Sequence, residues 1–81
     1  MHIENLVKMA NNIGDFFQSD PDHEAAVHAV ADHLKKFWDP RMRKQIIKHY
    51  DEGGEGLREL TRESVRLLAE ENAALTQCGD G

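Results

Sequence analysis

The chain has 81 residues and a formal charge of −5, because fifteen acidic residues outnumber ten basic ones. This length is about half that of an average domain, and no apolar run exceeds three residues, so we expect one soluble globular domain at most, without a membrane span or a secretory signal. The single cysteine excludes an internal disulfide and favours a reducing, cytoplasmic setting.

Apolar residues recur at helical spacing from the beginning of the chain. Between Ile3 and Phe17 they fall within one arc if each residue turns by about 100°. Gly14 lies inside this arc, which predicts a close crossing by a second helix rather than a break. Phe16 lies off the edge of the arc and therefore needs a second contact.

Two Asp-Pro pairs predict the starts of the next two helices. Asp20 is the expected N-cap of a helix over residues 21–38, because aspartate accepts backbone hydrogen bonds there and proline at the first helical position loses none. Asp39 repeats this pattern and predicts a short third helix over residues 40–50.

The glycine-rich stretch 53–56 predicts a stop and a turn before a fourth helix over residues 57–75. No segment alternates with a period of two, so we expect an all-α fold: a small bundle of four helices, the third short, in which sequential helices pack roughly antiparallel. Residues 1–76 should form a single helical domain and residues 77–81 a flexible C-terminal tail. The expected core consists of Leu6, Ile13, Phe17, Val27, Val30, Leu34, Phe37, Ile46, Leu60 and Leu68.

Basic residues concentrate in the window 35–48, which holds six of them and one acidic residue. The window thus carries +5 and leaves −10 for the rest of the chain. Three interpretations are open: a solvated face, a docking surface for an acidic protein, and a nucleic-acid contact. Because the strongly negative remainder opposes phosphate, we expect no nucleic-acid partner.

The junction between the second and third helices combines residue types that dominate protein interfaces. The Asp-Pro pair at residues 39–40 stiffens the junction, so docking would order little additional chain. The residues expected to bind a partner are Phe37, Trp38, Arg41, Met42, Arg43, Lys44 and Lys48. The alternative is that Phe37 and Trp38 are internal, since both also belong to the apolar stripe of their helix.

Two charged residues fall on apolar stripes. Arg43 shares an arc with Ile46 and Tyr50, which predicts a buried or interfacial charge pair. Glu71 lies inside the stripe of the fourth helix, where a lone buried carboxylate would cost stability. We therefore expect Glu71 to mark the point where this stripe meets solvent or a partner.

Catalytic and metal sites have little support in the sequence. His23, His28 and His33 are spaced by five residues, so they do not share one helix face as metal ligands would. Cys78 lies in the expected tail without a fixed base, and the stretch 53–56 lacks the spacing of a phosphate-binding loop. We expect no catalytic, cofactor-binding or metal-binding residues in this chain.

Four stretches in the same order resemble the delta subunit of NAD-dependent formate dehydrogenases. The most specific is the string Phe-Trp-Asp-Pro-Arg-Met-Arg at residues 37–43, and the resemblance extends over about residues 3–60. The matching stretches are residues 6–17, 21–22, 33–43 and 53–57.

The resemblance implies a non-catalytic accessory subunit of a cytoplasmic molybdenum enzyme. In that family other subunits carry molybdopterin, iron–sulfur clusters and FMN, oxidise formate to carbon dioxide and reduce NAD. The implied partner is the catalytic (alpha) subunit, and the implied role is support of complex assembly and molybdenum cofactor insertion. In the alternative, this chain itself binds the molybdopterin nucleotide, whose pyrophosphate would favour the helix start at Pro40 and the cluster Arg41, Arg43, Lys44 and Lys48.

Overall fold

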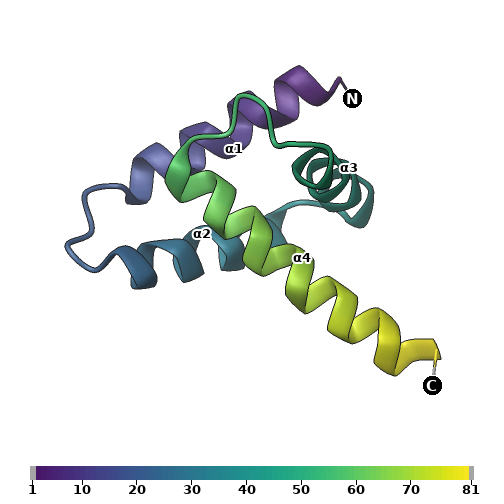
Figure 1. The fold of residues 1–81 in the computed structure, drawn as a ribbon. Coiled ribbons are helices and arrows are strands. Elements are labelled where there is room, and N and C mark those ends of the chain that lie inside the picture. The colour runs from purple at the N-terminus through teal and green to yellow at the C-terminus, as the bar shows by residue number, and fades with distance from the viewer. Residues whose placement is uncertain (1, 81) are drawn as a thin grey trace.

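The computed structural model describes the backbone of residues 2–80 and the side chains of residues 2–71, and all regular structure in this range is helical. The helices are α1 (Ile3–Phe17), α2 (His23–Phe37), α3 (Pro40–Asp51) and α4 (Glu59–Asp80) (Figure 1). With 12 residues, α3 is the shortest. The expected all-α fold of four helices with a short third is confirmed. The division into a domain at 1–76 and a flexible tail at 77–81 stays a prediction, because no side chain of the tail is described.

The N-cap of α2 is Asp22, two residues after the expected one. The carboxylate of Asp22 accepts a hydrogen bond from the backbone N–H of Ala25 at 3.2 Å. The carboxylate of Asp20 instead accepts one from the N–H of Asp22 at 2.9 Å. The prediction that Asp20 caps the helix is therefore wrong: both aspartates flank Pro21 and can act as caps, and the first one closes a side-chain turn before the helix begins.

The link between α2 and α3 consists of Trp38 and Asp39, both in extended backbone conformations. Asp39 caps α3 as expected, because its carboxylate accepts a hydrogen bond from the N–H of Met42 at 3.0 Å. This short extended link does not let α3 fold back along α2, and the two helices make little contact. Contrary to the expectation for sequential helices, they do not pack as neighbours, whereas α1 packs on α2 and α3 on α4.

The other three helices assemble around α4, which crosses α2 and packs on it most extensively (Figure 1). The buried side of α4 includes two small polar residues, Thr61 and Ser64. The hydroxyl of Ser64 donates a hydrogen bond to the carbonyl of Leu60 at 2.8 Å, so its burial leaves no unsatisfied group.

The core follows most of the sequence prediction. Six of the expected residues are buried, and three others are partly buried against them. The exception is Phe37, which is 71% exposed, so its assignment to the core was wrong. The chain leaves the helix directly after Phe37, and the side chain of Trp38 takes the core position instead. The buried hydrophobic cluster comprises Leu6, Ala10, Ala26, Val30, Leu34, Trp38, Ile46, Leu57, Leu60, Val65 and Leu68.

Gly14 allows α1 to approach α4 as closely as the sequence predicted. It is buried, and a Cβ atom at this position would collide with Oγ1 of Thr61. The hydroxyl of Thr61 thus fills the space that a side chain on α1 would need. The absence of a Cβ atom at residue 14 sets the distance between the two helices.

We predict that Gly14→Ala destabilises the protein by about 1–3 kcal/mol, the usual effect of an overpacked core. This is the opposite of the effect on an isolated helix, where alanine is favoured over glycine by about 1 kcal/mol. The measurement is the free energy of unfolding in urea. The control is the double variant Gly14→Ala with Thr61→Ala. Its free energy of unfolding should fall by less than the sum of the decreases in the two single variants, because the colliding hydroxyl is gone. An unchanged or higher stability of Gly14→Ala would contradict the prediction.

Candidate partner-binding surface

The residues expected to bind a partner lie at the end of α2, in the link and along α3. The structure separates them by exposure. Trp38 is buried at 6% exposure, and Met42 is half-buried against the same core. Their side chains hold the junction together from inside, and the exposed members of the set are Phe37, Arg41, Lys44 and Lys48.

Arg43 is half-buried and joins α3 to the end of α2. Its Nη1 atom donates a hydrogen bond to the carbonyl oxygen of Lys35 at 2.8 Å. The last carbonyls of a helix lack partners within the helix and carry partial negative charge, so a guanidinium there is stabilising. Within the described residues the partner of Arg43 is thus a backbone carbonyl rather than the carboxylate that the sequence suggested.

Ion pairs connect segments that are far apart in the sequence. Lys35 of α2 pairs with Glu71 of α4, and both side chains are more than a third exposed. Glu71 therefore lies where the apolar stripe of α4 reaches solvent, as the sequence suggested. Arg58, just before α4, pairs with Asp15 of α1.

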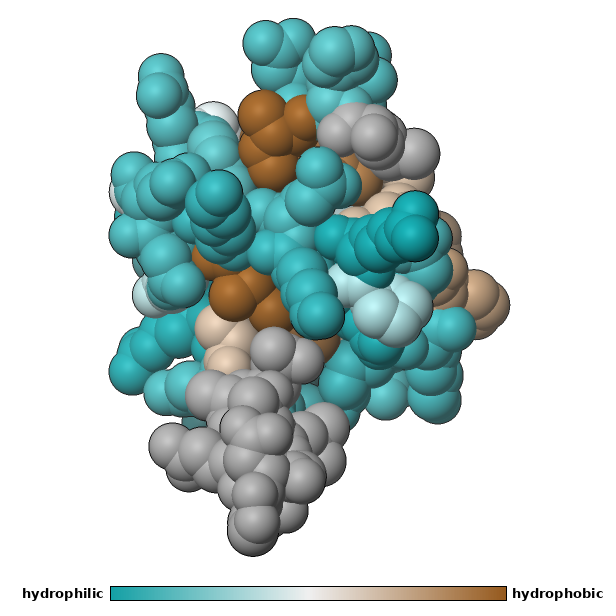
Figure 2. All heavy atoms as spheres, turned by 90° about the vertical axis from the view of Figure 1, so that its right-hand side faces the viewer, coloured by the Kyte–Doolittle hydropathy of each residue, from teal (hydrophilic) through white to brown (hydrophobic). Residues whose placement is uncertain are grey.

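Three exposed cations lie along one side of α3, namely Arg41, Lys44 and Lys48, which we call the basic line. Spacings of three and four residues place them on one helix face. Among residues 2–71, no carboxylate forms an ion pair with any of the three. Figure 2, which views the side where α3 and the end of α4 lie, shows mainly hydrophilic side chains with small hydrophobic areas between them. The basic line is thus a set of charges available to an acidic partner.

A second exposed feature, which the sequence analysis did not identify, consists of four rings from α1 and α2. Phe16 is 78% exposed and its ring centroid lies 5.2 Å from that of Phe17. The ring of Phe17 lies 6.5 Å from His33, and His33 lies 4.6 Å from Phe37. We call these four residues the aromatic surface. One signal in the sequence pointed to the aromatic surface, because Phe16 lay off the apolar arc and needed a second contact. Phe17 supplies that contact, and most of the Phe16 side chain stays exposed.

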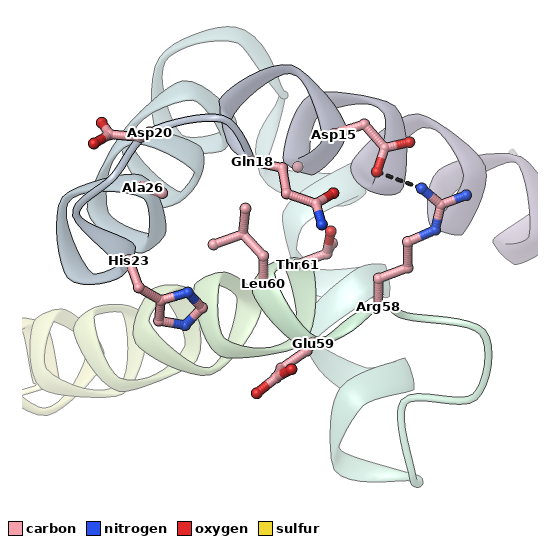
Figure 3. Close-up of a pocket in the computed structure, with 10 residues that line it drawn as sticks. Asp15, Gln18, Asp20, His23, Ala26, Arg58, Glu59, Leu60 and Thr61 are labelled. Carbon is pink, nitrogen blue, oxygen red and sulfur yellow. Dashed lines mark hydrogen bonds and ion pairs between the residues drawn. The ribbon is translucent and has the colours of Figure 1, made fainter.

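Two of the hollows that border these helices lie close to the residues described above. One, of about 270 Å³, lies beside the aromatic surface and is otherwise lined by Asn12 and Ile13. The other, of about 290 Å³, lies between the end of α1 and the start of α4, where the Asp15–Arg58 ion pair borders it (Figure 3). At its base the hydroxyl of Thr61 is buried without a hydrogen-bond partner among the described residues. Acidic and basic side chains are mixed around this second hollow, so its charge favours no particular ligand.

His23 lies beside the second hollow and connects α2 to α4. Its Nε2 atom forms a hydrogen bond and ion pair with the carboxylate of Glu63. This hydrogen bond, and next the charge of Glu63, raise the pKa of His23 above its ordinary value of 6.5, with smaller contributions from Glu59 and Asp22. The protonated imidazole is thus favoured in the folded protein.

Within the side chains that the structure describes, no three His, Cys, Asp or Glu residues gather where they could hold a metal ion. Cys78 lies outside this range. In the same part of the chain, no helix combines the length and the apolar character that crossing a membrane requires.

A model of a known protein family matches the chain. The model of the NADH-dependent formate dehydrogenase delta subunit, FdsD, matches residues 5–65, which include most of α1, all of α2 and α3, and the first turns of α4. The chain belongs to this family. No curated protein and no solved structure matched it.

As a delta subunit, the chain is part of a formate dehydrogenase complex, and the other subunits of that complex are its partners. The match includes the whole of the basic line and of the aromatic surface. Both exposed features therefore lie in the part of the chain that the family shares.

We predict that the pair between His23 and Glu63 stabilises the fold at low pH and is lost as the pH rises. Because folding raises the pKa of His23, the contribution is complete below about pH 6.5 and disappears as the pH passes through the raised pKa. The measurement compares the melting temperature of the wild type with that of His23→Gln across this range. The wild type should melt higher at pH 5.5, and the two curves should converge in alkaline solution. Parallel curves at all pH values would contradict the prediction.

Proposed function

We propose that this delta subunit is a non-catalytic accessory subunit of a cytoplasmic NAD-dependent formate dehydrogenase. It binds the catalytic (alpha) subunit, and it supports assembly of the complex and insertion of the molybdenum cofactor. The observation that carries the proposal is the family match over residues 5–65. In this proposal the molybdopterin, iron–sulfur clusters and FMN belong to other subunits.

The basic line supports α3 as the contact with the catalytic subunit. Its three cations form no ion pair among the described residues, although the whole chain carries −5. Such a local reversal of charge steers and orients the approach of an acidic surface. The interior of the junction adds rigidity, because Trp38 is buried and Arg43 is hydrogen-bonded to the end of α2. Docking would therefore cost little conformational entropy.

We predict that Arg41→Ala with Lys44→Ala weakens binding to the catalytic subunit by roughly 2 kcal/mol, about 30-fold, which is the effect of losing an interface hot spot. The remaining binding should also depend less on salt concentration, because two charges have been removed. The measurement is isothermal titration calorimetry with the purified catalytic subunit. Arg43 is left in place because it holds the end of α2.

The matched control is Lys8→Ala with Arg66→Ala, which removes the same charge from exposed positions on α1 and α4. It should bind like the wild type. Equal affinity of the test and control variants, with unchanged helical melts, would exclude the basic line as the contact.

The assembly role predicts a defect in the catalytic subunit when this chain is missing. Cells that express the other subunits without it should yield a complex with less molybdenum per catalytic subunit and slower formate oxidation. Equal molybdenum content and equal turnover with and without the chain would contradict the role. Saturable binding of the molybdopterin nucleotide by the isolated chain would instead favour the alternative, in which the basic residues of α3 hold the cofactor directly.

A further inference from the structure

The aromatic surface contains the two most exposed large hydrophobic residues among the described side chains. The large hydrophobic residues that are exposed in this range are Met9, Phe16 and Phe37, and the two phenylalanines retain 78% and 71% of their accessible surface. The rings of Phe17 and His33 join them into one continuous surface across α1 and α2. Scattered single hydrophobic residues are ordinary on protein surfaces, but a connected group of aromatic rings indicates an interaction site.

We infer that the aromatic surface is a second docking site, which receives an apolar side chain from an acidic segment of another formate dehydrogenase subunit. The inference rests on the proposed function, because it gives the accessory subunit a second point of contact within the complex. The inference also goes beyond the proposed function, because the basic line alone would hold the partner only by charge.

The size and lining of the site suit a single apolar side chain. The hollow beside the rings has about 270 Å³, near the lower end of the roughly 300–1,000 Å³ of small-molecule sites. Its lining consists of Asn12, Ile13, Phe16, Phe17 and His33, without a carboxylate, lysine or arginine. A hollow of this kind suits the apolar anchor that forms the centre of a protein interface, where aromatic residues contribute most.

The charge beside the rings favours an acidic partner. Phe37 is the last residue of α2, and Arg41, the first cation of the basic line, follows only four residues later at the start of α3. A segment that places an apolar side chain against the rings can therefore place carboxylates against the basic line.

The test uses the full chain co-expressed with the other formate dehydrogenase subunits. The variant Phe16→Gln with Phe37→Gln removes both exposed rings, and the control Phe16→Leu with Phe37→Leu keeps the positions apolar. We expect recovery of the complex to fall at least tenfold for the glutamine variant and to stay within about twofold of the wild type for the leucine variant. Because both side chains are mostly exposed, the thermal melts should remain unchanged; if the double variant does not fold, Phe16→Gln alone is used.

Each other outcome has a distinct meaning. Full recovery with the glutamine variant overturns the docking site and leaves the proposed function intact. A wild-type chain that does not associate with the other subunits overturns both. A wild-type chain that forms dimers by itself, with a monomeric glutamine variant that still joins the complex normally, assigns the surface to a second copy of this chain and overturns the inference.

Discussion

Burial of Trp38 is the constraint on which both exposed surfaces depend. Its indole occupies the core at 6% exposure, and the chain leaves the helical conformation at this residue, directly after Phe37. The last ring of α2 is therefore left outside, and α3 starts in a new direction with Asp39 as its cap. Loss of a buried tryptophan side chain costs about 3–5 kcal/mol, a large part of the stability of any small domain. The aromatic surface and the basic line are thus fixed in relation to each other by an internal residue.

A second constraint fixes α4 against α1. Gly14 lets the hydroxyl of Thr61 approach, and Asn11 holds the preceding loop through bonds to the carbonyl of Gly56 and the N–H of Arg58, at 2.8 and 3.0 Å. The loop can turn there because three of its glycines adopt positive φ, a region that side chains disfavour. A chain of 81 residues can bury only a small apolar core. Specific contacts such as these compensate for the small buried apolar area.

The different roles proposed for the two surfaces follow from their chemistry. Exposed charges act over about 8 Å in physiological salt and guide an approaching partner, whereas rings contribute mainly after water has been removed from them. In the two proposals, the basic line therefore guides the approach of the partner, and the aromatic surface contributes to binding after contact. Arg43 belongs to neither surface, because its guanidinium is bonded to the carbonyl of Lys35 and so stabilises the scaffold that carries both.

The sequence by itself determined the four helices, the cap at Asp39, the glycine turn and the close approach at Gly14, because each depends on local spacing, on the conformational freedom of glycine or, at Gly14, on the absence of a side chain. It also located the excess of basic charge, since composition is independent of folding. Only the tertiary structure decided which neighbouring aromatic residue faces inward. Phe37 and Trp38 share one apolar stripe, and the choice between them depends on where α2 ends relative to the core. The aromatic surface was hidden for the same reason: Phe16, Phe17, His33 and Phe37 lie up to 21 positions apart along the chain, and only the packing of α1 on α2 joins their rings.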